Sequence, residues 1–169
     1  MFRFNKSNIM TKIIDNFLDE NYFLQLKNLV ISHDFPWFFQ KNINSEQSRD
    51  DLYFYFTHIL YSNDKPNSVF FTLFESLLNE MGYEKLIRVK LNLYPRTEKL
   101  IINASHIDDV EEHRGFLLYF NSCDSKTILK DMHVDCVANR AVYFNPTIPH
   151  SSSSCTNAKA RFSLNVNYK

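Results

Sequence analysis

Glycine is scarce in this sequence: two residues, Gly82 and Gly115, occur among 169. The Walker phosphate loop and the dinucleotide-binding fingerprint each need several glycines at short spacing, because their backbones approach phosphate groups closely. Neither motif is present, so ATP and NAD are not expected as cofactors. Cysteine is also rare. Cys123, Cys136 and Cys155 are widely spaced and form no Cys-x-x-Cys pair, which predicts free thiols rather than a disulfide framework or a structural zinc site.

Net charge is absent as well, because 19 basic residues balance 19 acidic ones. A neutral chain does not favour broad electrostatic attraction to nucleic acid or to anionic membranes. No apolar run reaches the roughly 20 residues that span a bilayer, and the first residues lack the apolar stretch of a secretion signal. We therefore expect a cytoplasmic protein without a membrane or nucleic-acid partner, acting on a small molecule or a peptide.

Two segments, residues 87–94 and 160–168, alternate between apolar and polar side chains. This alternation predicts strands with one dry face and one polar face. The polar faces either meet water, as in ordinary half-buried strands, or line one cavity together. They consist of Arg88, Lys90, Asn92 and Tyr94 in the first strand, and of Arg161, Ser163, Asn165 and Asn167 in the second. The apolar face of the first strand, predicted to pack on helices, consists of Ile87, Val89, Leu91 and Leu93.

The triplet His106-Ile107-Asp108 is a candidate metal-binding element. Residues two apart on an extended strand project to the same face, so His106 and Asp108 are expected to point together. With His150 from a distant strand they would form a two-histidine, one-carboxylate set that leaves coordination positions open on iron. Taken alone, the triplet is a weak signal, because such a triplet can also occur by chance in a chain of this composition. A lone histidine such as His150 is as often a surface residue as a metal ligand.

The segment after the triplet offers a second group of candidate metal ligands. Asp109, Glu111, Glu112 and His113 could in principle bind a cation. We favour a solvated loop, because a run of charged residues is usually a surface feature.

In order and spacing, the C-terminal half of the chain resembles the iron(II)- and 2-oxoglutarate-dependent dioxygenases, specifically the branch similar to prolyl hydroxylases. One departure concerns the strand after the metal carboxylate loop, where the family often has Gly-Gly-Leu and this chain has Ser125-Lys126-Thr127-Ile128-Leu129. The segments that carry the resemblance are residues 92–95, 106–108, 115–121, 145–150 and 161–163.

The resemblance implies two groups of functional residues. The first group holds Fe(II) and forms the catalytic centre: His106, Asp108 and His150. The second group binds the cosubstrate 2-oxoglutarate: Arg161 at its distal carboxylate, assisted by Ser163, Tyr119 and Tyr94. A planar guanidinium suits two-point recognition of a carboxylate, whereas tyrosines in strands are more often packing residues when read without the resemblance.

The implied reaction is a hydroxylation that consumes O2 and 2-oxoglutarate and releases succinate and CO2, with ascorbate as a candidate reductant. Our leading hypothesis is a peptidyl, prolyl-like or free amino-acid substrate held near Arg88, Lys90 and Asn92. Related halogenases have a small residue in place of Asp108, so hydroxylation is favoured over halogenation. Two alternatives stay open: a non-catalytic jelly-roll module that binds metal, and the same oxidative chemistry on a modified nucleobase.

The expected fold is mainly β (α+β): a double-stranded β-helix jelly roll with N-terminal helices buttressing one sheet. We expect a single oxygenase domain over residues 1–169, in which residues 1–84 supply helical and strand support and residues 85–169 form the jelly-roll core. Before residue 85 we expect strands at 12–17, 37–39 and 52–57, a polar loop at 42–51, a helix opened by Asp19 and Glu20, and a second helix from Asn67 or Ser68 through Met81.

The second helix is predicted to pack through a stripe at helical spacing: Phe70, Leu73, Phe74, Leu77, Leu78 and Met81. The abundance of Asn, Lys, Phe and Ile is typical of an AT-rich genome, such as that of a phage, another virus or a streamlined bacterium. For a viral protein the expected location is the host cytoplasm.

Overall fold

The computed structural model of the protein describes residues 11–41, 54–130 and 132–169. Most of the described elements are strands. The larger sheet contains β1 (Lys12–Ile14), β2 (Phe38–Gln40), β3 (Tyr55–Ser62), β4 (Lys65–Pro66), β5 (Leu86–Pro95), β6 (Arg114–Tyr119), β9 (Ala141–Phe144) and β11 (Ala160–Tyr168). The smaller sheet contains β7 (Lys126–Leu129), β8 (Met132–Asp135) and β10 (Ser151–Ser152). The helices are α1 (Glu20–Ile31), the 3₁₀ helix η1 (Phe71–Phe74) and α2 (Glu75–Met81).

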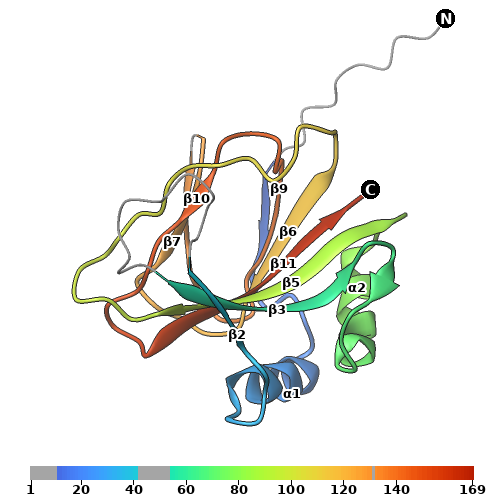
Figure 1. The fold of residues 1–169 in the computed structure, drawn as a ribbon, viewed down its shortest axis with the longest axis horizontal. Helices are drawn as coiled ribbons and strands as arrows, with labels where there is room; N and C mark the ends of the chain where they lie inside the picture. Colours follow the sequence, from blue (N-terminus) through green and yellow to red (C-terminus); the bar gives the residue numbers. More distant parts are fainter. Residues whose placement is uncertain (1–10, 42–53, 131) are drawn as a thin grey trace, which may run out of the picture.

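The strands form two antiparallel sheets. The larger one has the order β1-β9-β6-β11-β5-β3-β2, with β4 paired to β3, and the smaller one has the order β10-β7-β8. The last strand, β11, therefore lies in the middle of the larger sheet, between β6 and β5. In Figure 1 the helices lie beside the larger sheet, on the side away from β7 and β10. This arrangement confirms the predicted jelly roll with helices against one sheet.

Helix α1 begins where the sequence predicts. The carboxylate of Asp19 accepts hydrogen bonds from the backbone N–H groups of Asn21 (3.0 Å) and Tyr22 (3.2 Å), which satisfies two donors of the first turn. The buried face of the helix consists of Phe23, Leu26 and Val30.

The second helical segment differs from the prediction of one continuous helix. It starts with a 3₁₀ turn, η1, and becomes α-helical from Glu75. Residues three apart share a face in a 3₁₀ helix, so Phe71 and Phe74 are buried, while Leu73 is 51% exposed. The predicted stripe is therefore wrong at Leu73 and correct at the buried Phe74, Leu77, Leu78 and Met81.

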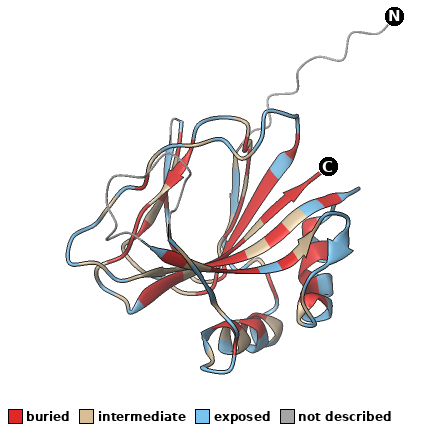
Figure 2. Ribbon diagram, in the orientation of Figure 1, coloured by how far each residue is buried: buried red, intermediate tan, exposed pale blue. Residues whose placement is uncertain are grey.

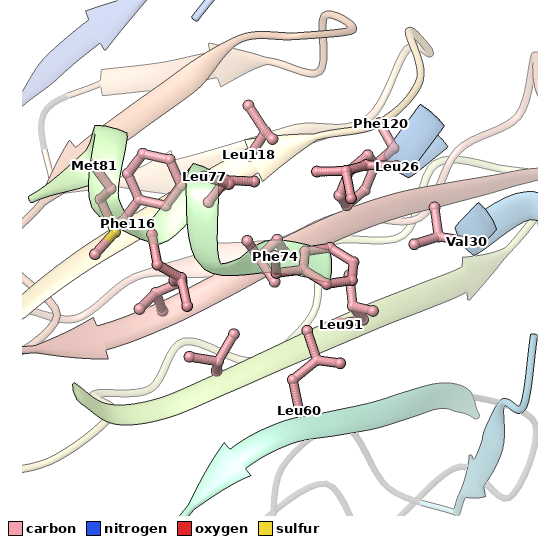
Figure 3. Packing of buried hydrophobic residues seen from close by; sticks show 14 of the residues in the cluster. Leu26, Val30, Leu60, Phe74, Leu77, Met81, Leu91, Phe116, Leu118 and Phe120 are labelled. Atoms are coloured by element: carbon pink, nitrogen blue, oxygen red, sulfur yellow. The ribbon is translucent and has the colours of Figure 1, made fainter. Parts of the chain in front are cut away.

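The main core lies between the helices and the larger sheet. Figure 2 shows buried segments concentrated on the central strands and on parts of the helices. Figure 3 shows how these side chains meet: Leu26 and Val30 of α1 and Phe74, Leu77 and Met81 of η1 and α2 pack with Leu60, Leu91, Phe116, Leu118 and Phe120.

A second, smaller core joins the two sheets. Strand β6 contributes to both cores because its side chains alternate: Phe116 and Leu118 belong to the helix side, whereas Leu117 and Tyr119 pack with Leu129 of β7. Val134, Cys136, Val142 and Phe144 complete this smaller cluster.

Strand β5 contains an irregularity that the alternation does not predict. Asn167 of β11 lies opposite Arg88, but the next residue, Tyr168, lies opposite Leu86. Ile87 is the extra residue, so Leu86 is buried in the core and Ile87 is 36% exposed. The prediction that Ile87 packs on the helices is wrong, whereas Val89 and Leu91 are buried as predicted.

The remaining predictions from the N-terminal half are met in part. The strand expected at 12–17 ends at Ile14, and the one expected at 37–39 is β2. The strand expected at 52–57 is described from residue 54 and extends to Ser62 in β3, while the loop expected at 42–51 lies outside the described residues. The three cysteines are free thiols. None of the helices in the described ranges is long and apolar enough to cross a membrane.

Candidate active site

His106 and His150 are brought together by an isolated antiparallel bridge. Each backbone N–H donates to the carbonyl of the other residue at 2.9 Å, and the two rings lie 4.6 Å apart. Asp108, two residues beyond His106, donates its backbone N–H to the carbonyl of Pro146 at 3.0 Å. Segments about 40 residues apart in sequence are thus held by main-chain bonds, which places all three candidate ligands in one region.

The three side chains fit a single metal ion. Oδ1 of Asp108 lies 3.5 Å from Nε2 of His106 and 3.9 Å from Nε2 of His150. Metal bonds to imidazole nitrogen and carboxylate oxygen are about 2 Å long, so two ligand atoms of one ion lie at most about 4 Å apart. The two Asp–His distances meet this limit. Among the described residues, this group of side chains could hold a metal ion, and because its ligand atoms lie within 4.8 Å of one another, the two imidazoles would move slightly closer on binding.

His150 is oriented for binding through Nε2. Its Nδ1 lies 2.9 Å from the carbonyl of Ile148, which can only accept, so Nδ1–H donates and Nε2 keeps its lone pair. The edge contact with Phe144, at 5.1 Å between ring centroids, holds the ring in place. Burial lowers the pKa of His150, which favours the neutral imidazole that a metal requires.

Asp108 is held as a carboxylate. Burial by itself raises the pKa of Asp108, but the hydrogen bond to His106 and the positive charge of Arg88 together bring it well below its usual range. Nη2 of Arg88 lies 3.5 Å from Oδ2, the oxygen further from the imidazoles.

Arg161 is a buried cation with no carboxylate partner among the residues that the structure describes. It is 1% exposed. Nη1 donates to the carbonyls of Lys126 and Ser153, each at 3.2 Å, and Nη2 donates to Oγ1 of Thr127 at 2.8 Å, while Nε has no partner. A buried charge without a counter-charge is costly, so an anion bound beside this guanidinium would offset that cost.

Two tyrosine rings enclose this guanidinium. Its central carbon lies 5.6 Å from the ring centroid of Tyr94 and 5.3 Å from that of Tyr119. Burial raises the pKa of both tyrosines, so their hydroxyls stay protonated. The hydroxyl of Tyr119 donates to Thr127 at 2.6 Å, so Tyr119 acts on Arg161 through its ring and through Thr127.

One cavity contains both the metal set and Arg161. Strands β5 and β11 face it with paired polar residues, Tyr94 opposite Arg161, Asn92 opposite Ser163 and Lys90 opposite Asn165. Of the two alternatives for the polar faces, the structure therefore shows the shared cavity. The predicted residues that line it are His106, Asp108, His150, Arg161, Ser163, Tyr94, Lys90 and Asn92.

Two predicted site residues lie elsewhere. Tyr119 does not line the cavity, and Arg88 lines a neighbouring one. Lys90 is close to the ring of Tyr55, at 5.9 Å, and burial lowers its pKa to about 8.

Sequence reasoning missed several residues of the cavity. Tyr55 stacks on Tyr94 at 5.3 Å, and Thr127 accepts hydrogen bonds from both Tyr119 and Arg161. The departure from Gly-Gly-Leu at residues 125–129 was the one signal that pointed to Thr127. The loop after Asp108 was predicted to be solvated. Asp109, Glu111 and Glu112 are exposed as predicted, but His113 is buried.

Comparisons with known proteins address the fold. No sequence-family profile matches the chain, and no curated protein matches it in sequence. Among solved structures, a 2OG-Fe(II) oxygenase family oxidoreductase from Burkholderia pseudomallei is similar over 99% of this chain and 93% of its own, with a TM-score of 0.67 and 11% identity.

Two prolyl hydroxylases are also similar in structure. The Pseudomonas putida prolyl-4-hydroxylase matches over 94% of this chain and 92% of its own, with a TM-score of 0.61 and 13% identity. The Trichoplax adhaerens prolyl hydroxylase, in complex with a peptide fragment of the hypoxia inducible factor oxygen degradation domain, matches over 96% and 84%, with a TM-score of 0.64 and 15% identity. The chain thus has the double-stranded β-helix fold of the 2-oxoglutarate- and Fe(II)-dependent oxygenases, as the resemblance predicted.

Proposed function

We propose that the protein is an Fe(II)- and 2-oxoglutarate-dependent oxygenase that hydroxylates a peptidyl or free amino acid. One observation carries the proposal: the His-Asp-His set shares a cavity with the guanidinium of Arg161, which has no carboxylate partner among the described residues. A cosubstrate with a metal-chelating keto acid at one end and a carboxylate at the other would bridge these two binding groups. 2-Oxoglutarate has this structure.

Each group in the cavity has a defined role in this proposal. His106, Asp108 and His150 would hold Fe(II), and a set of three ligands leaves positions open for the cosubstrate and O2. Arg161 would pair with the distal carboxylate of 2-oxoglutarate through two parallel hydrogen bonds. Tyr94 and Ser163, which line the same cavity, offer hydroxyl groups beside it.

When bound, Fe(II) and 2-oxoglutarate would supply the oxidation: one oxygen atom of O2 would enter succinate as CO2 is released from 2-oxoglutarate, and the other would become the oxygen of the new hydroxyl group. The protein contributes positioning and exclusion of water. Arg161, Ser163 and Asn92 are each less than 5% exposed, so the inner end of the cavity is shielded from bulk solvent. Low exposure strengthens the pairing between guanidinium and carboxylate, because water does not compete.

The substrate class of the proposal follows the similar structures and the site. A prolyl hydroxylase with this fold is in complex with a peptide, which supports a peptidyl residue as one candidate. A free amino acid is the other. Lys90 and Asn92 line the cavity with the metal set, and Arg88 lines the neighbouring cavity that shares Asp108, so a substrate bound beside Asp108 would lie near these residues.

Succinate formation tests the proposal. Purified protein with Fe(II), 2-oxoglutarate and O2, with and without ascorbate, should form succinate in the presence of a substrate from a panel of amino acids and proline-containing peptides. The His106→Ala and Asp108→Ala variants should form none, because each lacks a metal ligand. Arg96→Gln is a matched control, since Arg96 is exposed and lies outside the cavity.

Equal turnover in the ligand variants would refute the proposed site. Metal titration gives a second readout. If Mn(II) raises the melting temperature of the wild-type protein but 2-oxoglutarate neither binds nor is consumed, the protein is a metal-binding module rather than an oxygenase.

A further inference from the structure

A second cavity shares Asp108 with the first. Its volume is about 260 Å³, and Arg88, His113 and Asn167 are among the residues that line it. Its position follows from the pairing of β5 with β11. The polar residues of these two strands face one another in pairs, which we call the polar ladder. Arg161 lies opposite Tyr94 at one end of it, and Asn167 lies opposite Arg88 at the other. Six residues of extended strand separate Arg161 from Asn167, which is roughly 20 Å.

Buried polar atoms without a partner gather at these two cavities. Seven side-chain nitrogen and oxygen atoms of the described residues are buried and make no hydrogen bond. Such atoms are rare in folded proteins, and a cluster of them marks a place for water or a ligand. Three of them, on Asn92, Asn165 and Arg161, belong to residues of the first cavity. The other four belong to residues that line the second cavity, of which Asp108 lines both: Nε of Arg88, Oδ2 of Asp108, Nε2 of His113 and Oδ1 of Asn167.

Two of these atoms can accept a hydrogen bond from an N–H donor. Nδ1 of His113 lies 2.8 Å from the carbonyl of Glu111, so Nδ1–H donates there, and in this tautomer Nε2 is the acceptor of the ring. Oδ1 of Asn167 can only accept. His113 is 3% exposed and Asn167 is 4% exposed, so neither side chain lies on an open surface.

Arg88 provides the complementary charge. The other two basic residues of the cavity have acidic partners: Lys85 lies 3.0 Å from Asp64, and Lys169 lies 3.6 Å from Glu111. The partner of Arg88 is Asp108, at 3.5 Å. A bound metal would take up much of the negative charge of Asp108, so Arg88 would then retain attraction for a further carboxylate.

We propose that this second cavity binds the primary substrate, and that the substrate is a small free amino acid or a close analogue. Its carboxylate would pair with Arg88, and its ammonium group would donate to His113 and Asn167. The inference rests on the proposed oxygenase function and selects the free amino acid over the peptidyl residue. An internal residue of a peptide has neither charge.

Binding measured without turnover tests the inference. Protein loaded with Mn(II) and 2-oxoglutarate under nitrogen would be titrated calorimetrically with each common free amino acid, and with the same amino acids acetylated at nitrogen and amidated at the carboxyl group. At least one free amino acid should bind, and its blocked counterpart should bind about tenfold more weakly or worse, because each lost charge-assisted hydrogen bond weakens binding by that order. A proline-containing peptide should bind no better than the blocked form.

Variants locate the site. Arg88→Gln and His113→Gln should each weaken binding of that amino acid about tenfold, whereas the exposed control Arg96→Gln should not. Mn(II) and 2-oxoglutarate titrations of every variant, with thermal melting, separate loss of substrate binding from misfolding or loss of the metal.

Two outcomes overturn the inference. One is that no free amino acid binds although Mn(II) and 2-oxoglutarate do. The other is that a blocked derivative or the peptide binds as tightly as the free form. Failure of Mn(II) or 2-oxoglutarate to bind the wild-type protein would instead overturn the proposed function itself.

Discussion

At the scale of single residues, the site depends on charges that have been removed from water. Arg161 is the clearest case, because it is fully buried, enclosed by two tyrosine rings and without an acidic partner in the described part of the chain. In the proposed function, the same arrangement makes the guanidinium attractive to a carboxylate. His150 is the opposite case, since burial lowers its pKa and favours the neutral imidazole that a metal would require.

Replacing Arg161 tests whether its guanidinium pairs with the distal carboxylate of 2-oxoglutarate. Arg161→Lys keeps the charge but loses the fork of donors, so the affinity for 2-oxoglutarate should fall by about 10-fold to 100-fold, the range for losing one charge-assisted hydrogen bond. Calorimetry with Mn(II)-loaded protein measures this affinity. Affinity for Mn(II) alone should not change, and unchanged affinity for 2-oxoglutarate would contradict the assigned role.

Lys90 makes the stability depend on pH in a predictable direction. Burial lowers its pKa to about 8, below the unfolded value of 10.5, so the unfolded chain binds more protons between these pH values. Below pH 8 the buried charge costs its full amount, and the cost disappears as the pH rises toward 10.5. Lys90→Met should therefore stabilise the metal-free protein at pH 7, by on the order of 2 kcal/mol, and this gain should shrink by pH 10.

Urea unfolding of the wild type and of Lys90→Met at both pH values measures that difference. A gain that is constant with pH would show that Lys90 is not buried as a charge. Lys159→Met serves as the control, because Lys159 is exposed and should show no such dependence.

At the scale of elements, the site is built where β5, β6, β9 and β11 run side by side. Strands β5 and β11 carry the polar ladder. Strand β9, paired with β6, carries Phe144, whose ring contacts His150. Gly115 of β6 lies opposite Phe144 of β9, and a Cβ atom at residue 115 would lie 2.6 Å from the Phe144 ring. Because Phe144 in turn contacts His150, the absence of a side chain at Gly115 helps to position a candidate metal ligand.

Gly115→Ala tests this connection. The added methyl group should push the Phe144 ring away, lower the stability by about 1–3 kcal/mol, as overpacking does, and weaken Mn(II) binding through His150. Calorimetry and thermal melting measure the two effects. In Gly115→Ala combined with Phe144→Leu, the smaller side chain should restore part of the metal affinity; an unaffected single variant would exclude the connection.

At the scale of the whole molecule, the larger sheet separates two environments. Its helix side is an apolar core, and its other side holds the polar cavities and the smaller sheet. The helices therefore stabilise the sheet without contributing ligands to the candidate metal set. This division allows the polar face to vary in chemistry while the core keeps the strands in register.

A pair of neighbouring substitutions measures the contribution of the core. Phe74 is fully buried, so Phe74→Ala should lower the free energy of unfolding by about 3–5 kcal/mol. Leu73 is 51% exposed, so Leu73→Ala should change it by less than about 1 kcal/mol. Urea unfolding of both variants checks the prediction. Similar losses would mean that the segment is one continuous α-helix, as its sequence alone suggests.

The amino-acid sequence by itself determined the two strands that face the cavity and their polar faces, because alternation at every second residue is a local property. The strand expected at His106-Ile107-Asp108 is instead an isolated bridge between His106 and His150, outside the named strands. The cap at Asp19 is equally local. Only the tertiary structure decided that Ile87 is displaced from the core, that Tyr119 reaches Arg161 through Thr127, and that Arg88 lines a separate cavity from Lys90. These features depend on which distant strands become neighbours and on where their register shifts, which no local pattern encodes.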